Sequence, residues 1–213
     1  MTIQINPNKD ALIIVDPQLD FCPGGALAVE GGDQIMPAIS VLAHEFRAAG
    51  GIVAITQDWH TADQISFASR HGVDPFTKKT VAYGEQDMWP DHCVQGTPGA
   101  EFHPGLDTTT AKVIIRKGTN PEVDSYSAHR ENDKVSETGL TGYLRYMGVR
   151  RCFYVGLAYD FCVGFSALDG KLDGFETIVI RNLTRAISTE TAEVMKWRLD
   201  EAGVPNIEWR FEI

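Results

Sequence analysis

Hydrophobic and polar residues alternate along the chain in short blocks that predict strands and helices in turn. Runs of apolar residues predict buried strands at Ala11–Val15 and Ile52–Thr56. Between them, apolar residues recur every three or four positions, which is the stripe of a helix: Ile35, Ile39, Leu42, Phe46 and Ala49. Gly50-Gly51 is predicted to end that helix.

The same alternation continues in the second half of the chain. Further strands are predicted at Lys112–Arg116, Cys152–Val155 and Thr177–Ile180, and an edge strand at Ile207–Phe211. Helices are predicted near Glu137–Met147, at Cys162–Leu172, and after a cap at Ser188 or Thr189, the last with an inner face of Ala192, Met195, Leu199 and Ala202. Strands that alternate with helices favour a mostly parallel sheet covered on both faces. We therefore expect an α/β fold, with residues 1–213 forming one three-layer α-β-α domain.

The segment from Asp58 to Thr110 does not follow this rhythm. It is rich in Gly, Pro, His, Asp and Trp and shows no sustained period. A long irregular segment inside a compact domain is usually functional. We expect it to contribute to a site.

Charge and cysteine content narrow the function classes. The 213 residues include 29 acidic and 19 basic side chains, for a formal net charge of −10. This balance argues against a nucleic-acid partner and against an anionic membrane surface. The polar start at Met1–Asp10 does not resemble a secretory signal, and the four cysteines lack a C-x-x-C pairing. We expect free thiols and a cytoplasmic protein.

Reactive residues follow four of the predicted strands. Asp16 ends the first strand, Asp58 and His60 follow the second, and Lys117 ends the third. Cys162 follows the fourth strand, at the start of a helix. Because ligands bind beyond the carboxyl ends of parallel strands, we expect these side chains to meet at one edge of the sheet.

Cys162 is the candidate nucleophile among the four cysteines. A helix N-terminus and a nearby ammonium from Lys117 are both expected to lower its pKa. Asp16 is a candidate proton carrier, although a strand-end aspartate on its own more often bonds turn amides. The other cysteines are interpreted as small buried apolar residues: Cys22, Cys93 and Cys152.

A metal site is predicted from Asp58-x-His60 together with the distant His92. One carboxylate and two imidazoles suit zinc, iron or manganese with open positions. Asp-x-His alone is a weak signal, so the alternative of structural histidines stays open. The remaining histidines are interpreted as structural: His44, His71, His103 and His129.

Five segments of the chain resemble the nicotinamidases (also pyrazinamidases), the metal-dependent branch of the isochorismatase-like cysteine hydrolases. These segments are Asp16 to Phe21, Gln57 to His60, Trp89 to Cys93, Lys117-Gly118 and Gly156 to Cys162. The resemblance runs in order from Asp16 to about Gly174. The stretch Arg181–Ser188 lacks the Asp and Gly residues frequent in relatives, which leaves the shape of one pocket rim open.

The resemblance implies a role for each matched residue. Asp16, Lys117 and Cys162 would form a catalytic triad, and the backbone N–H groups of Ala158 and Cys162 an oxyanion hole beside a cis Leu157–Ala158 bond. The metal, zinc before iron or manganese, would be held by Asp58, His60 and His92, with Ser66 acting through water. The substrate ring would lie between Phe21, Trp89 and Tyr126.

The implied reaction is hydrolysis of nicotinamide to nicotinic acid and ammonia through a cysteine thioester, in NAD salvage. A ureido or carbamoyl amidohydrolase of the same superfamily is the alternative enzyme, and it would need no metal. An inactive interaction scaffold is the alternative from another class. The small-molecule substrate is the only partner implied, and the sequence leaves a homo-oligomer open.

Overall fold

The computed structural model describes residues 4–210, whose centre is a six-stranded sheet with the order β5-β2-β1-β6-β7-β8. The strands are β1 (Asp10–Val15), β2 (Ile52–Asp58), β5 (Val113–Lys117), β6 (Arg151–Leu157), β7 (Glu176–Arg185) and β8 (Asn206–Ile207). Every pair of neighbouring strands is parallel. The predicted mostly parallel sheet is confirmed.

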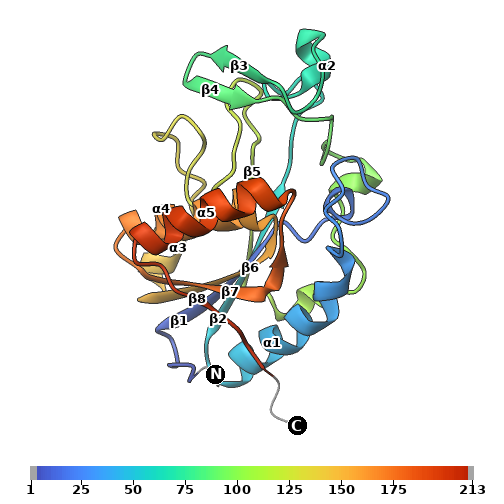
Figure 1. Cartoon of the computed structure of the whole chain (residues 1–213). Helices are drawn as coiled ribbons and strands as arrows, with labels where there is room; N and C mark the ends of the chain where they lie inside the picture. Colours follow the sequence, from blue (N-terminus) through green and yellow to red (C-terminus); the bar gives the residue numbers. More distant parts are fainter. Residues whose placement is uncertain (1–3, 211–213) are drawn as a thin grey trace.

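Helices cover both faces of this sheet (Figure 1). On one face lies α1 (Met36–Ala48), and on the other lie α3 (Leu140–Tyr146), α4 (Gly164–Leu172) and α5 (Thr189–Glu201). Successive residues of β1 serve opposite cores: Leu12 and Ile14 pack toward α1, and Ala11 and Ile13 toward the other helices. The three-layer prediction is therefore confirmed.

The predicted helices and strands agree with the structure to within a few residues, with two corrections. Cys162 belongs to a π-helical turn, η5 (Tyr159–Val163), that leads into α4, rather than to the α-helix itself. The predicted edge strand Ile207–Phe211 is shortened to Asn206–Ile207, and Phe211 lies outside the described residues. Beyond Ile207 the Asn182 side chain takes the place of a strand partner. Its amide N–H donates to the Trp209 carbonyl, and its amide oxygen accepts from the Trp209 N–H.

The segment between β2 and β5 contains small elements that the sequence pattern did not predict. A hairpin of β3 (Lys78–Val81) and β4 (Gly84–Asp87) and the short α2 (Ala68–His71) lie beyond the sheet, at the top of Figure 1. The same segment contains the short 3-10 turns η3 (Pro98–Ala100) and η4 (Thr108–Thr110), and two more precede α1: η1 (Leu19–Phe21) and η2 (Asp33–Ile35). The hairpin strands are mostly exposed and polar, so they carry no apolar alternation to detect.

The strand order reverses between β1 and β6. From β1 the chain proceeds outward through β2 to β5, and it then returns to place β6 on the other side of β1. Ligands of open α/β sheets bind at such a switch point, beyond the carboxyl ends of the strands. The residues that follow β1 and β6 are Asp16 and the loop to Cys162.

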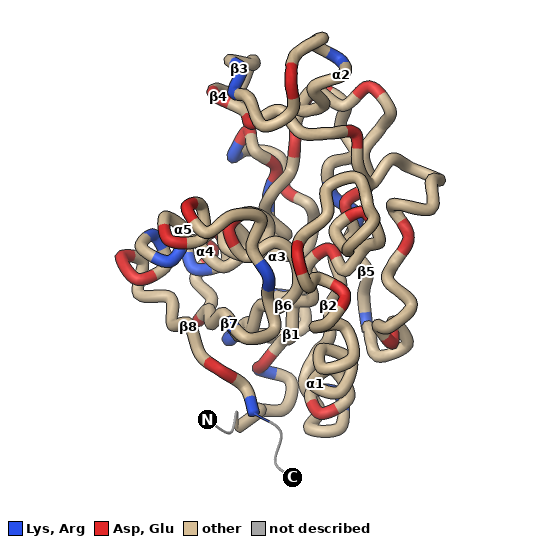
Figure 2. Tube along the Cα trace, turned by 45° about the vertical axis from the view of Figure 1, so that its right-hand side comes forward, with Lys and Arg blue, Asp and Glu red and all other residues tan. Residues whose placement is uncertain are grey.

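Charged residues are spread over the molecule. Lys and Arg occur on several elements and are interspersed with Asp and Glu (Figure 2). No helix among residues 4–210 is long and apolar enough to cross a membrane.

Candidate active site

The loop that carries Cys162 begins at the buried end of β6. Gly156 has φ of +107°, and a Cβ there would lie 2.2 Å from the carbonyl oxygen of Val15, so only glycine fits against β1. The next bond, Leu157–Ala158, is cis, as the resemblance implied. The chain then turns through η5, where the N–H of Val163 donates to the carbonyl of Ala158 at 3.0 Å. Cys162 thereby lies at the switch point, 6% exposed.

Asp16 and Lys117 reach the same place from β1 and β5. Lys117 Nζ lies 2.9 Å from Asp16 Oδ2 and 3.7 Å from Cys162 Sγ, and both charged side chains are fully buried. The Thr56 hydroxyl donates to Asp16 Oδ1 at 2.6 Å. The three predicted triad residues are therefore adjacent in space.

The protonation states at this triad differ from the sequence-based expectation. Burial raises the pKa of the Cys162 thiol well above its usual range, and the Asp16 and Asp58 carboxylates add to that effect. The ammonium of Lys117 lowers the thiol pKa, but by less than burial raises it. The prediction of a lowered thiol pKa is wrong for this arrangement, because desolvation outweighs one cation. Cys162 is a thiol at neutral pH and needs a base.

Asp16 has the properties of that base. Burial raises its pKa to about 6, while Lys117 and the hydrogen bond from Thr56 favour the ionised form. A carboxylate with this pKa is ionised at neutral pH and takes up a proton more readily than an exposed aspartate. One oxygen each from Asp16 and Asp58 and the sulfur of Cys162 lie within 4.8 Å of one another.

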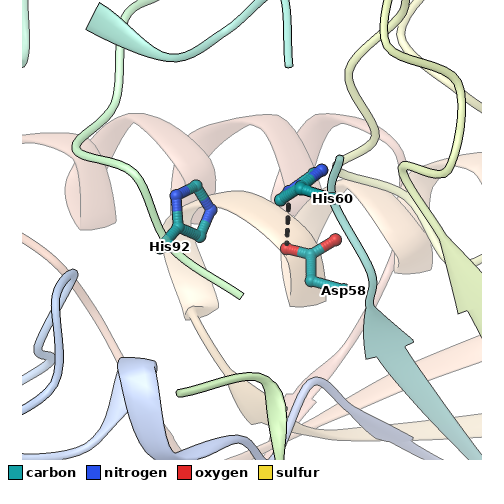
Figure 3. Close-up of side chains that lie close together, drawn as sticks. All are labelled: Asp58, His60 and His92. Carbon is teal, nitrogen blue, oxygen red and sulfur yellow. Dashed lines mark ion pairs between the residues drawn. The ribbon is translucent and has the colours of Figure 1, made fainter. Parts of the chain in front are cut away.

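Asp58, His60 and His92 form a buried cluster beside the triad (Figure 3). Their potential ligand atoms all lie within 4.8 Å of one another, and His60 Nε2 is 3.5 Å from Asp58 Oδ2. Each histidine has Nδ1 near a backbone carbonyl, at 3.1 Å from Gly118 for His60 and at 2.8 Å from Pro90 for His92. A carbonyl only accepts, so Nδ1 carries the proton and Nε2 remains the ligand atom.

This cluster fits a divalent metal ion by its chemistry. Two imidazoles oriented by second bonds and one carboxylate form a donor set suited to a transition metal with open positions. Although burial opposes it, the carboxylates of Asp58 and Asp124 raise the pKa of His60 to about 9, which shows that the surroundings favour a positive charge. Ser66 Oγ is buried and has no hydrogen-bond partner within residues 4–210, as expected of a group that bonds a metal-bound water.

A small pocket opens over Cys162 and the cluster. The three residues predicted to hold the substrate ring, Phe21, Trp89 and Tyr126, all line it. Trp89 Nε1 donates to the Tyr126 hydroxyl at 3.1 Å. The sandwich role of these rings stays a prediction.

Other residues of the pocket wall were not identified from the sequence. They include Leu27, Phe161 and Ile187. Phe161 directly precedes Cys162 in η5, and its ring centroid lies 4.8 Å from that of Trp89. Ile187 belongs to the stretch Arg181–Ser188, whose shape the sequence leaves open. Apart from its place next to Cys162, nothing in the sequence marks Phe161 as part of the pocket.

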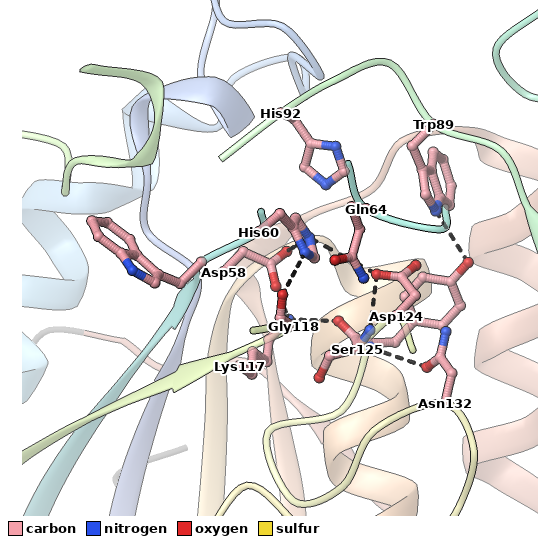
Figure 4. Close-up of polar contacts among 12 residues, drawn as sticks. Asp58, His60, Gln64, Trp89, His92, Lys117, Gly118, Asp124, Ser125 and Asn132 are labelled. Carbon is pink, nitrogen blue, oxygen red and sulfur yellow. Dashed lines mark hydrogen bonds and ion pairs between the residues drawn. The ribbon is translucent and has the colours of Figure 1, made fainter. Parts of the chain in front are cut away.

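A polar network behind Tyr126 was also missed, and Figure 4 labels two of its members, Asp124 and Asn132. Gln86, on β4, donates from Nε2 to Asp124 Oδ2 at 2.9 Å and to the Tyr126 hydroxyl at 2.8 Å, and Asn132 donates to Gln86 Oε1 at 2.9 Å. Asp124 Oδ1 in turn lies 3.9 Å from His60 Nε2. The network ties the β3–β4 hairpin to the metal-ligand cluster.

Among the residues interpreted as structural, Cys93 adjoins the reactive set, because its carbonyl accepts from the His60 N–H at 3.0 Å. All four cysteines are free and buried, and Cys152 packs inside β6. His129 is buried between the hydroxyls of Thr141 and Tyr154, at 2.8 Å from each. Of the remaining histidines, His44 pairs with Asp107 at the surface.

Comparisons with known proteins agree with this geometry. The model of the isochorismatase domain family matches residues 10–210. A nicotinamidase from Acinetobacter baylyi is 46% identical over 205 residues, covering 95% of this chain and 94% of the relative. A solved nicotinamidase/pyrazinamidase from Acinetobacter baumanii superposes with a TM-score of 0.91 at 45% identity, covering 95% and 97% of the two chains.

A further solved structure carries a metal. The pyrazinamidase of Pyrococcus horikoshii in complex with zinc superposes with a TM-score of 0.78 at 36% identity, covering 94% of this chain and 99% of that one. The family match and these relatives extend over nearly the whole length. The chain therefore belongs to the isochorismatase domain family, within its nicotinamidase and pyrazinamidase branch.

Proposed function

We propose that this chain hydrolyses nicotinamide to nicotinic acid and ammonia through a thioester on Cys162, as a step of NAD salvage. The observation that carries the proposal is the position of a buried thiol beside a carboxylate, an ammonium and a metal-ligand cluster, with the thiol and the cluster lining one pocket. A relative named nicotinamidase is 46% identical over 95% of this chain. The linear carboxamide of the substrate is the group such a thiol attacks.

In the first half of the reaction, Cys162 attacks the amide carbon while Asp16 takes the thiol proton. The carbon–sulfur bond forms, and the backbone N–H groups of Ala158 and Cys162 stabilise the oxyanion, where one such donor is worth about 3 kcal/mol. Asp16 returns the proton to the departing nitrogen, the carbon–nitrogen bond breaks, and ammonia leaves.

In the second half, water attacks the thioester carbon. Asp16 takes a proton from that water, the carbon–sulfur bond breaks, and nicotinic acid leaves as Cys162 regains its proton. Throughout, Lys117 holds Asp16 by an ion pair at 2.9 Å and keeps its negative charge near the sulfur. Phe21, Trp89 and Tyr126 are proposed to hold the aromatic ring.

Asp58, His60 and His92 are proposed to hold one divalent ion, zinc in preference to iron or manganese, with Ser66 acting through water. When bound, the ion would take the pyridine nitrogen at an open position and so orient the ring. Zinc is favoured because it accepts mixed nitrogen and oxygen ligands, and because a relative 36% identical was solved with zinc.

Two further proposals concern the chain as a whole. We infer that residues 1–213 act as one domain, which is supported by one continuous sheet and a family match over residues 10–210. Four free cysteines fit a reducing compartment, which supports the inferred cytoplasmic location.

Ammonia release from nicotinamide by the purified protein tests the proposed function. The metal-loaded enzyme is expected to release ammonia, to lose that activity when a chelator removes the ion, and to regain it with zinc. Cys162→Ala is the matched control for non-enzymatic release. A folded, metal-loaded, reduced protein that ignores nicotinamide but hydrolyses an N-carbamoyl compound would instead establish the ureido-type amidohydrolase.

A further inference from the structure

Asp160 lies in the η5 turn, midway between Ala158 and Cys162, and is 3% exposed. Its carboxylate accepts hydrogen bonds from the segment that joins β7 to α5. The N–H of Ile187 lies 3.0 Å from each carboxylate oxygen, and the N–H of Ser188 lies 3.1 Å from Oδ2. The hydroxyl of Thr191 also donates to Oδ2. One buried side chain thus joins the nucleophile loop to another part of the chain.

The Asp160 carboxylate is the acceptor for two backbone N–H groups of this segment, those of Ile187 and Ser188. Without the acceptor, the Ile187 and Ser188 amides would lose partners in a half-buried segment, and each such loss is costly. The backbone at Ile187 is therefore held in place by the loop that carries Cys162.

Ile187 is the residue of this segment that contacts the substrate pocket. Its side chain lines the same pocket as Cys162, together with Leu27 and Phe161. It is half-buried and packs against the core that contains Phe21. A shift of its backbone would therefore change the width of the pocket over the thiol.

Capping of α5 does not by itself account for Asp160. The helix already has an N-cap, because Ser188 Oγ accepts from the Thr191 N–H at 3.1 Å. Asp160 bonds the N-cap residue Ser188 and Thr191 as well, but both of its oxygens also accept from the Ile187 N–H, which lies before the cap and outside the helix. Asp160 therefore holds the pocket wall in addition to the helix end.

We propose that Asp160 is a positioning residue that fixes Ile187 as the wall limiting the size of the aromatic amide accepted above Cys162. This inference rests on the proposed function. It makes the nucleophile loop and the wall one unit, so that the distance from the sulfur to the wall stays constant. Ile187 excludes substrates that carry an added ring substituent, and Asp160 maintains this exclusion because it prevents the Ile187 backbone from shifting.

The test is a double-mutant cycle of Asp160→Asn and Ile187→Ala, with KM and kcat measured for nicotinamide and for ring-methylated nicotinamides. Asp160→Asn keeps the size of the side chain but presents an N–H₂ group to donors. It is expected to raise KM for nicotinamide about tenfold, as a misplaced pocket group does, with a smaller change in kcat. Ile187→Ala is expected to raise KM for nicotinamide and to improve kcat/KM for the methylated compounds relative to it.

The coupling between the effects of the two substitutions on KM tests whether Asp160 acts through Ile187. If Asp160 acts through Ile187, Asp160→Asn adds little to KM in the Ile187→Ala protein. Thr191→Val is the control, since it removes one donor to Asp160 and leaves the Ile187 N–H bonded, and it should lower stability with KM unchanged. Additive effects on KM, or an Asp160→Asn protein that loses only stability, would overturn the proposal.

Two further measurements keep the outcomes separate. If Asp160→Asn does not fold, Asp160→Glu enters the same cycle, because it keeps the charge while displacing the segment. Calorimetric binding of nicotinic acid to the metal-loaded proteins needs no turnover. An inactive wild type that still binds nicotinic acid, with the same coupling, would contradict the proposed function alone. Absence of binding in every protein would overturn both.

Discussion

Lys117 Nζ lies 2.6 Å from Asp58 Oδ1, and this bond links the triad to the metal-ligand cluster. Lys117 also lies 2.9 Å from Asp16, so one buried ammonium compensates two buried carboxylates. The two carboxylates in turn raise the pKa of Lys117 well above its usual range. A single side chain from β5 therefore contacts both the proposed base and a proposed metal ligand.

Replacement of Lys117 by methionine should destabilise the metal-free protein strongly. It leaves Asp16 and Asp58 buried without a cation, and breaking a buried pair costs about 3–5 kcal/mol. Urea unfolding measures this. Lys78→Met removes an exposed partner of Glu85 and should change the midpoint little. Equal midpoints for Lys117→Met and wild type would contradict the role given to Lys117.

Replacement of Cys162 by alanine should abolish hydrolysis, because no thioester can form. Cys152→Ala is the matched control: that thiol is buried in β6, away from the pocket, and its loss should cost stability while kcat/KM stays near the wild-type value. Mass spectrometry of acid-quenched enzyme with substrate should find the acyl group on Cys162. An adduct on another cysteine would assign the nucleophile elsewhere.

The dependence of kcat/KM on pH should show an acid limb that belongs to Asp16. The carboxylate must be ionised to take the thiol proton, so activity is expected above its pKa of about 6 and lost below it. A bound ion offsets the charge of Asp58, which contributes to the raised value, so the midpoint should lie at or below pH 6. Metal content is measured at each pH because imidazole ligands also bind protons. A midpoint well above this value would exclude Asp16 as the titrating base.

Replacement of His92 by alanine should weaken binding of the metal ion and, with it, the orientation of the substrate ring. Loss of one of three ligands should weaken metal binding by more than the roughly 10–100-fold seen when an outer partner of a ligand is lost. Ser66→Ala, which removes only a hydroxyl proposed to act through water, should stay within that range. Competition with a chromophoric chelator measures both affinities. Comparable losses in the two variants would make Ser66 a direct ligand.

His129 should make the protein less stable as the pH falls. Burial lowers its pKa from 6.5 to about 4, so below pH 6.5 the unfolded chain binds the proton more readily than the folded one. Stability is therefore lost as the pH falls from 6.5 toward 4, by about 3 kcal/mol over that window. Urea midpoints of wild type and His129→Gln across this range should show a smaller slope for the variant. Equal slopes for the two proteins would show that another group carries the pH dependence.

The pattern of residues along the chain was sufficient to predict the main elements and the order in which reactive residues follow them. Apolar runs located β1, β2, β6 and the first half of β7, because a strand buried on both faces admits few polar residues. The run of β5 was also found, although Ile114 on this edge strand is exposed. Parallel strands present their carboxyl ends at one edge of the sheet. Asp16, Asp58, Lys117 and Cys162 could therefore be placed together from spacing and residue type.

Properties that depend on burial, or on contacts between distant segments, could be determined only from the folded structure. The thiol pKa of Cys162 was mispredicted because the sequence shows a neighbouring cation but not the loss of water around the sulfur. The wall at Ile187 depends on a carboxylate 27 residues earlier in the chain, and such long-range bonds leave no local periodicity. The β3–β4 hairpin is mostly exposed and polar, so no hydrophobic pattern revealed it. Local patterns encode which faces are buried, whereas desolvation and pocket shape arise only when separate segments pack together.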